Sequence, residues 1–171
     1  MNGLNLDWEP GHNKSGNIKP SQQEIDTFNA AFGAALAPQQ TLSACVAQWT
    51  PYTANFSRAL SAGGLNAVYD MGLYHGLSTS EWSGKLADAL RNTGSRGGRG
   101  LVVGFALAPK YAWENTTASV VDRFAALKSF GVRHVAVFAW AAGGLSGVHL
   151  PPSVLAEWTT QLQQFVSPSY V

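Results

Sequence analysis

The chain has 171 residues, of which 46% are hydrophobic and 12% charged, and its formal net charge is +1. This length allows one domain with a core, so we expect a single domain over residues 1–171. The low content of charged residues argues against a disordered chain. Because the net charge is close to zero, the chain has no strong positive potential that would attract nucleic acid or an acidic membrane surface. A single cysteine, Cys45, excludes an internal disulfide, and no apolar run has the length of a membrane span.

Residues 2–10 predict a first strand with two different faces, which Pro10 ends. Because side chains alternate along a strand, Asn5, Asp7 and Glu9 share one face. The opposite face is apolar, with Leu4, Leu6 and Trp8, and we expect helices to pack against it. A row of polar side chains within a buried strand is costly unless it has a function, so this strand is the candidate chemical centre.

The rest of the chain predicts helices alternating with strands. A first helix begins at Ser21, where Glu24 completes a capping box, and ends before Pro38. Its apolar spacing consists of Ile25, Phe28, Ala31, Phe32, Ala35 and Leu36. Further helices are expected at residues 52–61, 79–91, 117–130 and 154–165. Strands are expected at residues 42–49, 65–71, 101–107 and 132–140.

Strands that are apolar on both faces and alternate with amphipathic helices predict a parallel α/β sheet. Two architectures fit this pattern, a doubly wound open sheet and part of a (β/α)₈ barrel, also called a TIM barrel. A doubly wound nucleotide binder would show a glycine-rich fingerprint after its first strand, but this chain has Glu9 and Pro10 there. Barrel enzymes have their catalytic residues at the carboxyl ends of the strands, where this chain has acidic residues. The sequence therefore favours a partial barrel of five β-α units with its helices outside.

Three motifs resemble those of glycoside hydrolase family 18, the chitinases and chitobiase-like enzymes. Residues 2–9 (NGLNLDWE) resemble the signature DGxDxDxE, with matches at Gly3, Asp7 and Glu9 and with asparagine replacing aspartate at residues 2 and 5. Residues 67–70 (AVYD) are similar to the family's MxYD, and residues 138–140 (FAW) to the end of its last strand. The resemblance implies that the five units correspond to units four to eight of the barrel.

The resemblance also implies a reaction, the hydrolysis of β-linked N-acetylglucosamine polymers or oligosaccharides with help from the substrate's own acetamide. Glu9 would be the acid and then the base. Asp7 would raise the proton affinity of Glu9 and accept the acetamide N–H, and Asn5 would orient Asp7. Tyr69 would donate to the acetamide carbonyl. The substrate-binding residues would be Asn5, Asp70, Trp140 and Gln48, and no metal or other cofactor is needed.

Other roles stay open for this sequence. A barrel of this kind has eight units, and this chain has five. We expect one of three explanations: the chain is a fragment that lacks an N-terminal segment, a partner chain completes the barrel, or the chain is a structural subunit of a larger assembly. A catalytically silent chitin lectin is the alternative from the binding class. Sequons at residues 13, 55 and 115 point to the secretory pathway, although no signal peptide opens the chain. Cys45 is expected to be a buried, inert thiol.

Overall fold

The computed structural model describes residues 3–6, 21–46, 66–70, 78–92, 100–107, 116–138 and 150–168. Within these ranges the chain forms a five-stranded sheet in which every neighbouring pair is parallel. The strands are β1 (Gly3–Leu6), β2 (Thr41–Val46), β3 (Ala67–Asp70), β4 (Leu101–Ala106) and β5 (His134–Phe138).

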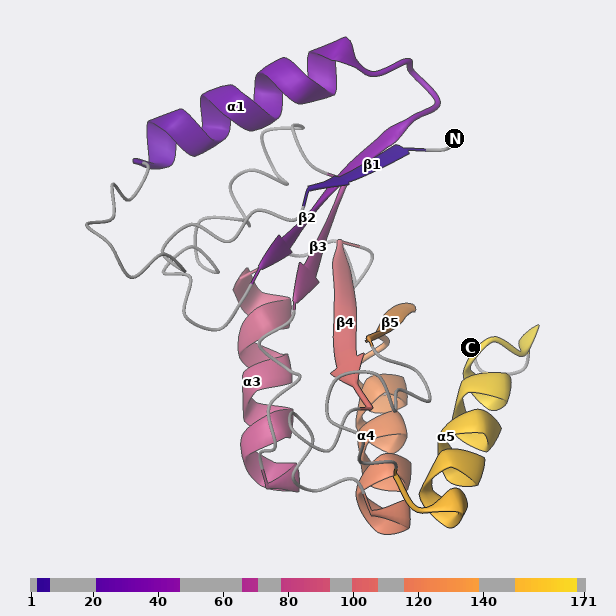
Figure 1. Cartoon of the computed structure of the whole chain (residues 1–171). Coiled ribbons are helices and arrows are strands. Elements are labelled where there is room, and N and C mark those ends of the chain that lie inside the picture. The colour runs from indigo at the N-terminus through magenta and orange to yellow at the C-terminus, as the bar shows by residue number, and fades with distance from the viewer. Residues whose placement is uncertain are drawn as a thin grey trace.

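The strands lie in the sheet in the same order as in the sequence, β1-β2-β3-β4-β5. A doubly wound sheet reverses its order at a switch point, whereas this sheet runs in one direction and curls into a half-barrel (Figure 1). The prediction of a partial α/β barrel is therefore confirmed. β1 and β5 are the two edge strands of the sheet in the described part of the chain.

Four helices accompany the strands in the described ranges. They are α1 (Gln22–Ala35), α3 (Thr79–Asn92), α4 (Thr117–Ser129) and α5 (Pro152–Phe165). Figure 1 shows α3, α4 and α5 together beside β4, while α1 lies at the other end of the sheet. The helix expected at residues 52–61 lies outside the described residues.

The ends of these elements follow from local chemistry. The predicted capping box at the start of α1 is confirmed, because the Ser21 hydroxyl accepts from the Glu24 N–H and the Glu24 carboxylate accepts from the Ser21 N–H. A second box, Thr116 with Ser119, opens α4 and was not predicted. Gly131 follows α4 with a φ of +68°, a conformation in which glycine meets no Cβ clash. α1 ends at Ala35 with Leu36 as its C-cap, two residues before Pro38, so the predicted end of this helix before Pro38 is confirmed.

The core lies between β4 and the three helices beside it. Phe105 of β4 is its centre, with ring centroids 5.8 Å from Trp82, 5.8 Å from Phe124 and 4.9 Å from Trp158. Trp82 and Trp158 are fully buried and pack in this core. The guanidinium of Arg123 lies 5.8 Å from the centre of the Trp82 ring, which gives this buried cation a favourable aromatic surface.

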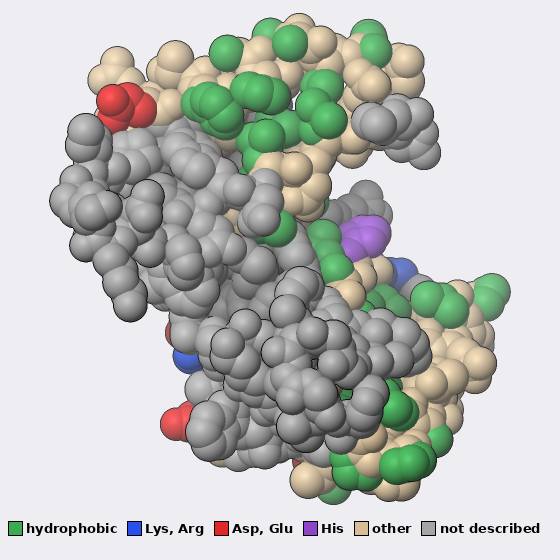
Figure 2. All heavy atoms as spheres, viewed as in Figure 1, with side chains coloured by type: hydrophobic (Ala, Val, Ile, Leu, Met, Phe, Trp, Pro, Cys, Tyr) green, Lys and Arg blue, Asp and Glu red, His purple; other side chains and the backbone are tan. Residues whose placement is uncertain are grey.

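Two expectations about apolar cover are wrong. Phe28 and Phe32 of α1 are 38% and 36% exposed, and Leu4 of β1 is 41% exposed. The reason is their position: α1 and β1 lie at the open edge of the half-barrel, where the described residues supply no further strand beyond β1. Figure 2 shows the hydrophobic side chains gathered along α1, at the top of the view. On α4, Val121 is also exposed, at 41%.

Candidate active site

The strand of the glutamate motif is fixed against β2 by its glycine. Gly3 pairs with Thr41, and a Cβ built on Gly3 would stand 2.2 Å from the Thr41 carbonyl oxygen and 2.6 Å from its Oγ1. No real Cβ approaches backbone so closely, so only glycine allows this spacing. The glycine of the motif therefore has a structural reason in this chain, the close approach of β1 to β2.

Alternation along the sheet separates a helix-facing row from an opposite row. Leu6 pairs with Ala44, Ala44 with Val68, and Val68 with Leu101, which lies in the core beside the helices. Because side chains alternate between faces, Asn5 belongs to the face turned away from the helices. In a closed barrel this is the inner face.

On that inner face the Asn5 side chain is held by two residues of β2. Its Nδ2 donates to the Ser43 hydroxyl oxygen at 3.0 Å, and its Oδ1 accepts from the Cys45 thiol at 3.3 Å. Cys45 is 7% exposed, which confirms its predicted burial. The buried thiol also takes part in a hydrogen-bond network with Asn5 and Ser43.

β3 brings a second motif to the same edge of the sheet. Tyr69 pairs with Cys45, and Asp70 pairs with Val46 and with Val103. Parallel strands end at a common edge, so the carboxyl ends of β1, β2 and β3 meet there. The register therefore places the backbone of Tyr69 two strands from β1, with Cys45 between them.

Four of the predicted site residues lie outside the described residues: Asp7, Glu9, Gln48 and Trp140. Of the others, Asn5 is described with its side chain, and Tyr69 and Asp70 through the register of β3. The structure thus places Asn5 on β1 and both Tyr69 and Asp70 on β3, with β2 between these two strands. The motif that ends at Trp140 begins at Phe138, the last residue of β5.

Sequence reasoning missed Ser43 and Cys45 as partners of Asn5. The available signal was the spacing of Thr41, Ser43 and Cys45, three residues that alternate along a predicted strand and so share a face. Among the described residues, no group of three or more His, Cys, Asp and Glu side chains is arranged to hold a metal ion. In the same ranges no helix has both the length and the apolar character that crossing a membrane requires.

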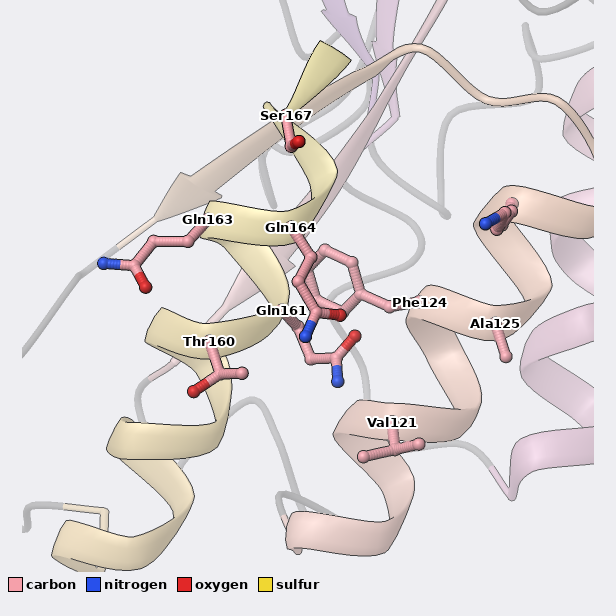
Figure 3. A pocket seen from close by; sticks show the side chains of 9 residues that line it. Val121, Phe124, Ala125, Thr160, Gln161, Gln163, Gln164 and Ser167 are labelled. Carbon is pink, nitrogen blue, oxygen red and sulfur yellow. The ribbon is translucent and has the colours of Figure 1, made fainter. Parts of the chain in front are cut away.

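A groove lies elsewhere, between α4 and α5, with a volume of about 700 Å³. Figure 3 shows the Gln161 and Gln164 side chains of α5 beside Phe124 of α4. Its lining comes from these two helices and from Ser167, just beyond α5, so it belongs to the outer helical layer and not to the strand ends.

Comparison of the chain with protein-family models, with curated proteins and with solved structures gave no match.

Proposed function

We propose that this chain supplies the acid-bearing strand of a glycoside hydrolase that cleaves β-linked N-acetylglucosamine chains, as its motifs resemble those of family 18. The observation that carries the proposal is the position of Asn5. It lies on the face of β1 turned away from the helices, on the strand that runs into Asp7 and Glu9, and two strands from Tyr69. A polar row on the inner face of a parallel half-barrel, at the carboxyl ends of its strands, is where barrel enzymes bind and react.

In this proposal Glu9 protonates the oxygen of the leaving sugar. The acetamide oxygen of the bound sugar attacks the anomeric carbon, and the glycosidic bond breaks to give an oxazolinium-type intermediate. Water then opens the intermediate and passes its proton to Glu9, which restores the acid. The configuration at the anomeric carbon is retained because it is inverted twice.

The negative charge of Asp7 has two roles in this scheme. It raises the proton affinity of Glu9, which keeps that residue protonated as an acid. It also accepts the acetamide N–H and stabilises the positive charge that develops on the acetamide during attack. Asn5 orients Asp7, and Tyr69 donates to the acetamide carbonyl.

The remaining assignments concern sugar binding. Trp140 offers an aromatic surface to the apolar face of the sugar, and Asp70 and Gln48 offer polar contacts along the cleft. No cofactor enters this reaction.

A structural or assembly role has its own supporting observation, the open edge formed by β1 and α1. Five strands do not close a barrel that takes eight, and Leu4, Phe28 and Phe32 leave apolar surface at that edge. We propose that further β-α units pack against this edge and complete the cleft, whichever polypeptide supplies them. The silent lectin remains the binding-class alternative, but the chain keeps Glu9, the acid that such a lectin does not need.

The substrate-assisted reaction is tested by asking whether hydrolysis requires the acetamide group of the substrate. Two nitrophenyl β-glycosides are compared, one of di-N-acetylchitobiose and one of cellobiose, which has hydroxyls in place of the acetamides. The proposal expects nitrophenol release from the first glycoside alone, with a product whose anomeric configuration is retained by NMR. Equal release from both glycosides, or an inverted product, would contradict the substrate-assisted reaction.

A further inference from the structure

Helix α1 buries a polar side chain and exposes apolar ones. Asn29 is 1% exposed, and among the described residues its amide nitrogen and oxygen have no hydrogen-bond partner. Phe28 and Phe32, one turn apart, are 38% and 36% exposed, and their ring centroids lie 4.7 Å apart. A surface helix of a folded domain normally has the opposite arrangement, with its apolar stripe toward the core. The outward stripe of α1 is therefore a surface for contact with another molecule.

The outward stripe alternates large and small side chains. It consists of Phe28, Ala31, Phe32 and Ala35, which have the i, i+3, i+4, i+7 spacing of one helix face and are all exposed. A second α1 can lie antiparallel on this face, with a two-fold axis between residues 31 and 32. Phe28 then faces Ala35 of the second copy. Phe32 faces Ala31 of the second copy, so every phenyl ring meets the space above an alanine.

We propose that two copies of this chain associate through α1, with the two helices antiparallel about this axis. A two-fold contact uses the same patch on both copies, so the patch must be complementary to itself. The order large, small, large, small along the stripe meets this requirement. The inference rests on the assembly part of the proposed function, because it names the polypeptide that packs on α1, and it is independent of the reaction.

The charges of α1 favour the antiparallel direction. Its two acids, Glu24 and Asp26, lie near its start, and residues 27–46 carry no charged side chain. In the antiparallel pair, the acidic half of each helix lies beside the uncharged half of the other. The two Glu24 Cα atoms are then about 22 Å apart along the helices, beyond the reach of charge repulsion at physiological salt. A parallel pair would bring the acids of both copies together.

A lipid surface fits this helix less well than a second copy. Helices that lie in a membrane interface carry Lys and Arg on their polar face. Residues 21–46 contain neither, and their two acids would be repelled by acidic lipids.

An exchange of side-chain size tests the facing pair of Phe28 and Ala35. Ala35→Phe sets two phenyl rings against each other, so we expect the dissociation constant of the dimer to rise by about tenfold or more in sedimentation velocity. Adding Phe28→Ala restores one large and one small side chain at each contact, and the constant should return to within about threefold of that of the unmodified chain. If exposed apolar surface alone drove association, Ala35→Phe would strengthen it. That result, or a double variant no better than the single one, would overturn the proposal.

Single cysteines test the direction of the two helices, with Cys45→Ser as the background. Ala31→Cys lies beside the axis, where the two Cα atoms are offset by about 1.5 Å along the helices, whereas those of Ala35→Cys are offset by about 10 Å. A disulfide requires Cα atoms within about 7 Å of each other. We expect Ala31→Cys to form a disulfide-linked dimer under mild oxidation and Ala35→Cys to remain unlinked. Equal linkage at both positions would indicate parallel helices and contradict the proposal. Both positions are exposed, so neither substitution disturbs the core.

Neither measurement involves hydrolysis, so the pairing and the reaction are tested separately. A chain that sediments as a monomer at about 0.1 mM would overturn the pairing and leave the reaction unaffected. Hydrolysis that survives Glu9→Gln, in a chain that still dimerises through α1, would overturn the reaction and leave the pairing intact.

Discussion

Gly3 and Thr41 lie too close together for any side chain at position 3, because a Cβ there would stand 2.2 Å from the Thr41 carbonyl oxygen. Gly3→Ala must therefore push β1 away from β2. We expect a loss of about 1–3 kcal/mol in the free energy of unfolding, the usual cost of overpacking. Urea denaturation followed by circular dichroism measures it.

Gly84 provides the matched control for that change. It lies within α3, and a Cβ built on it has nothing within 4 Å. Gly84→Ala should stabilise the chain by about 0.5–1 kcal/mol, since alanine loses less backbone entropy in a helix. Equal effects of the two substitutions would contradict the close approach of β1 to β2.

A second prediction concerns Phe105, whose ring packs against three other aromatic rings of the core. Phe105→Ala should lower the free energy of unfolding by about 3–5 kcal/mol, because the side chain is 1% exposed and its removal leaves a cavity. Phe130→Ala, at a side chain that is 42% exposed, should change it by less than about 0.5 kcal/mol. Thermal unfolding of the two variants decides whether Phe105 is the centre of the core.

A third prediction follows from two helix starts and concerns acid. Hydrogen bonds from the Ser21 N–H and hydroxyl lower the pKa of Glu24 below its ordinary value of 4.5, and those from the Ser78 hydroxyl and N–H lower that of Glu81. A group whose pKa is depressed in the folded state stabilises it at a pH above the ordinary value. That contribution is lost as the pH falls below 4.5 and through the folded-state pKa.

The doubly substituted Glu24→Gln/Glu81→Gln chain should therefore lose less stability than the unmodified chain between pH 5 and pH 3. Glutamine keeps an acceptor for the capping box but has no proton to take up. Melting temperatures measured across this range compare the two proteins. A parallel decline in both would show that these two carboxylates do not contribute.

A fourth prediction concerns the open edge of the half-barrel. If partner units dock on α1, Phe28→Gln with Phe32→Gln should weaken association of the chain, because these adjacent rings, 4.7 Å apart, leave apolar surface in solvent. Val121→Gln with Phe130→Gln, at exposed side chains of α4 and of its C-cap, removes comparable exposed apolar surface. Sedimentation velocity should show weaker association for the first pair of substitutions alone. Equally weakened association for both pairs would mean that any exposed apolar surface, and not α1 in particular, drives association.

The sequence predicted the helices and strands well, because these elements depend on local patterns of apolar residues and on helix caps. Periodic apolar residues identified α3 and α4, and the capping box of Ser21 with Glu24 marked the start of α1. The choice between an open doubly wound sheet and a barrel needed one further inference, from the residues after the first strand. The strand order in the structure agrees with it.

What the sequence did not predict depends on contacts between distant segments. The apolar spacing of Phe28 and Phe32 shows a helical stripe but not whether another element covers it. Ser43 is an ordinary polar residue in sequence, and its importance comes from register, which pairs it with Asn5. The apolar neighbours of Cys45 in the chain predicted its burial, but not that its thiol contacts a polar residue of the adjacent strand.

The most direct test of the proposed function is the rate at which the chain releases nitrophenol from the di-N-acetylchitobiose glycoside. We predict that Glu9→Gln lowers kcat about 10²- to 10⁴-fold, the usual contribution of a general acid and base. Glu24→Gln, the same substitution on the exposed side of α1, should retain the rate of the unmodified chain. Equal and measurable rates in the unmodified chain and Glu9→Gln would contradict the assignment of Glu9 as the catalytic acid.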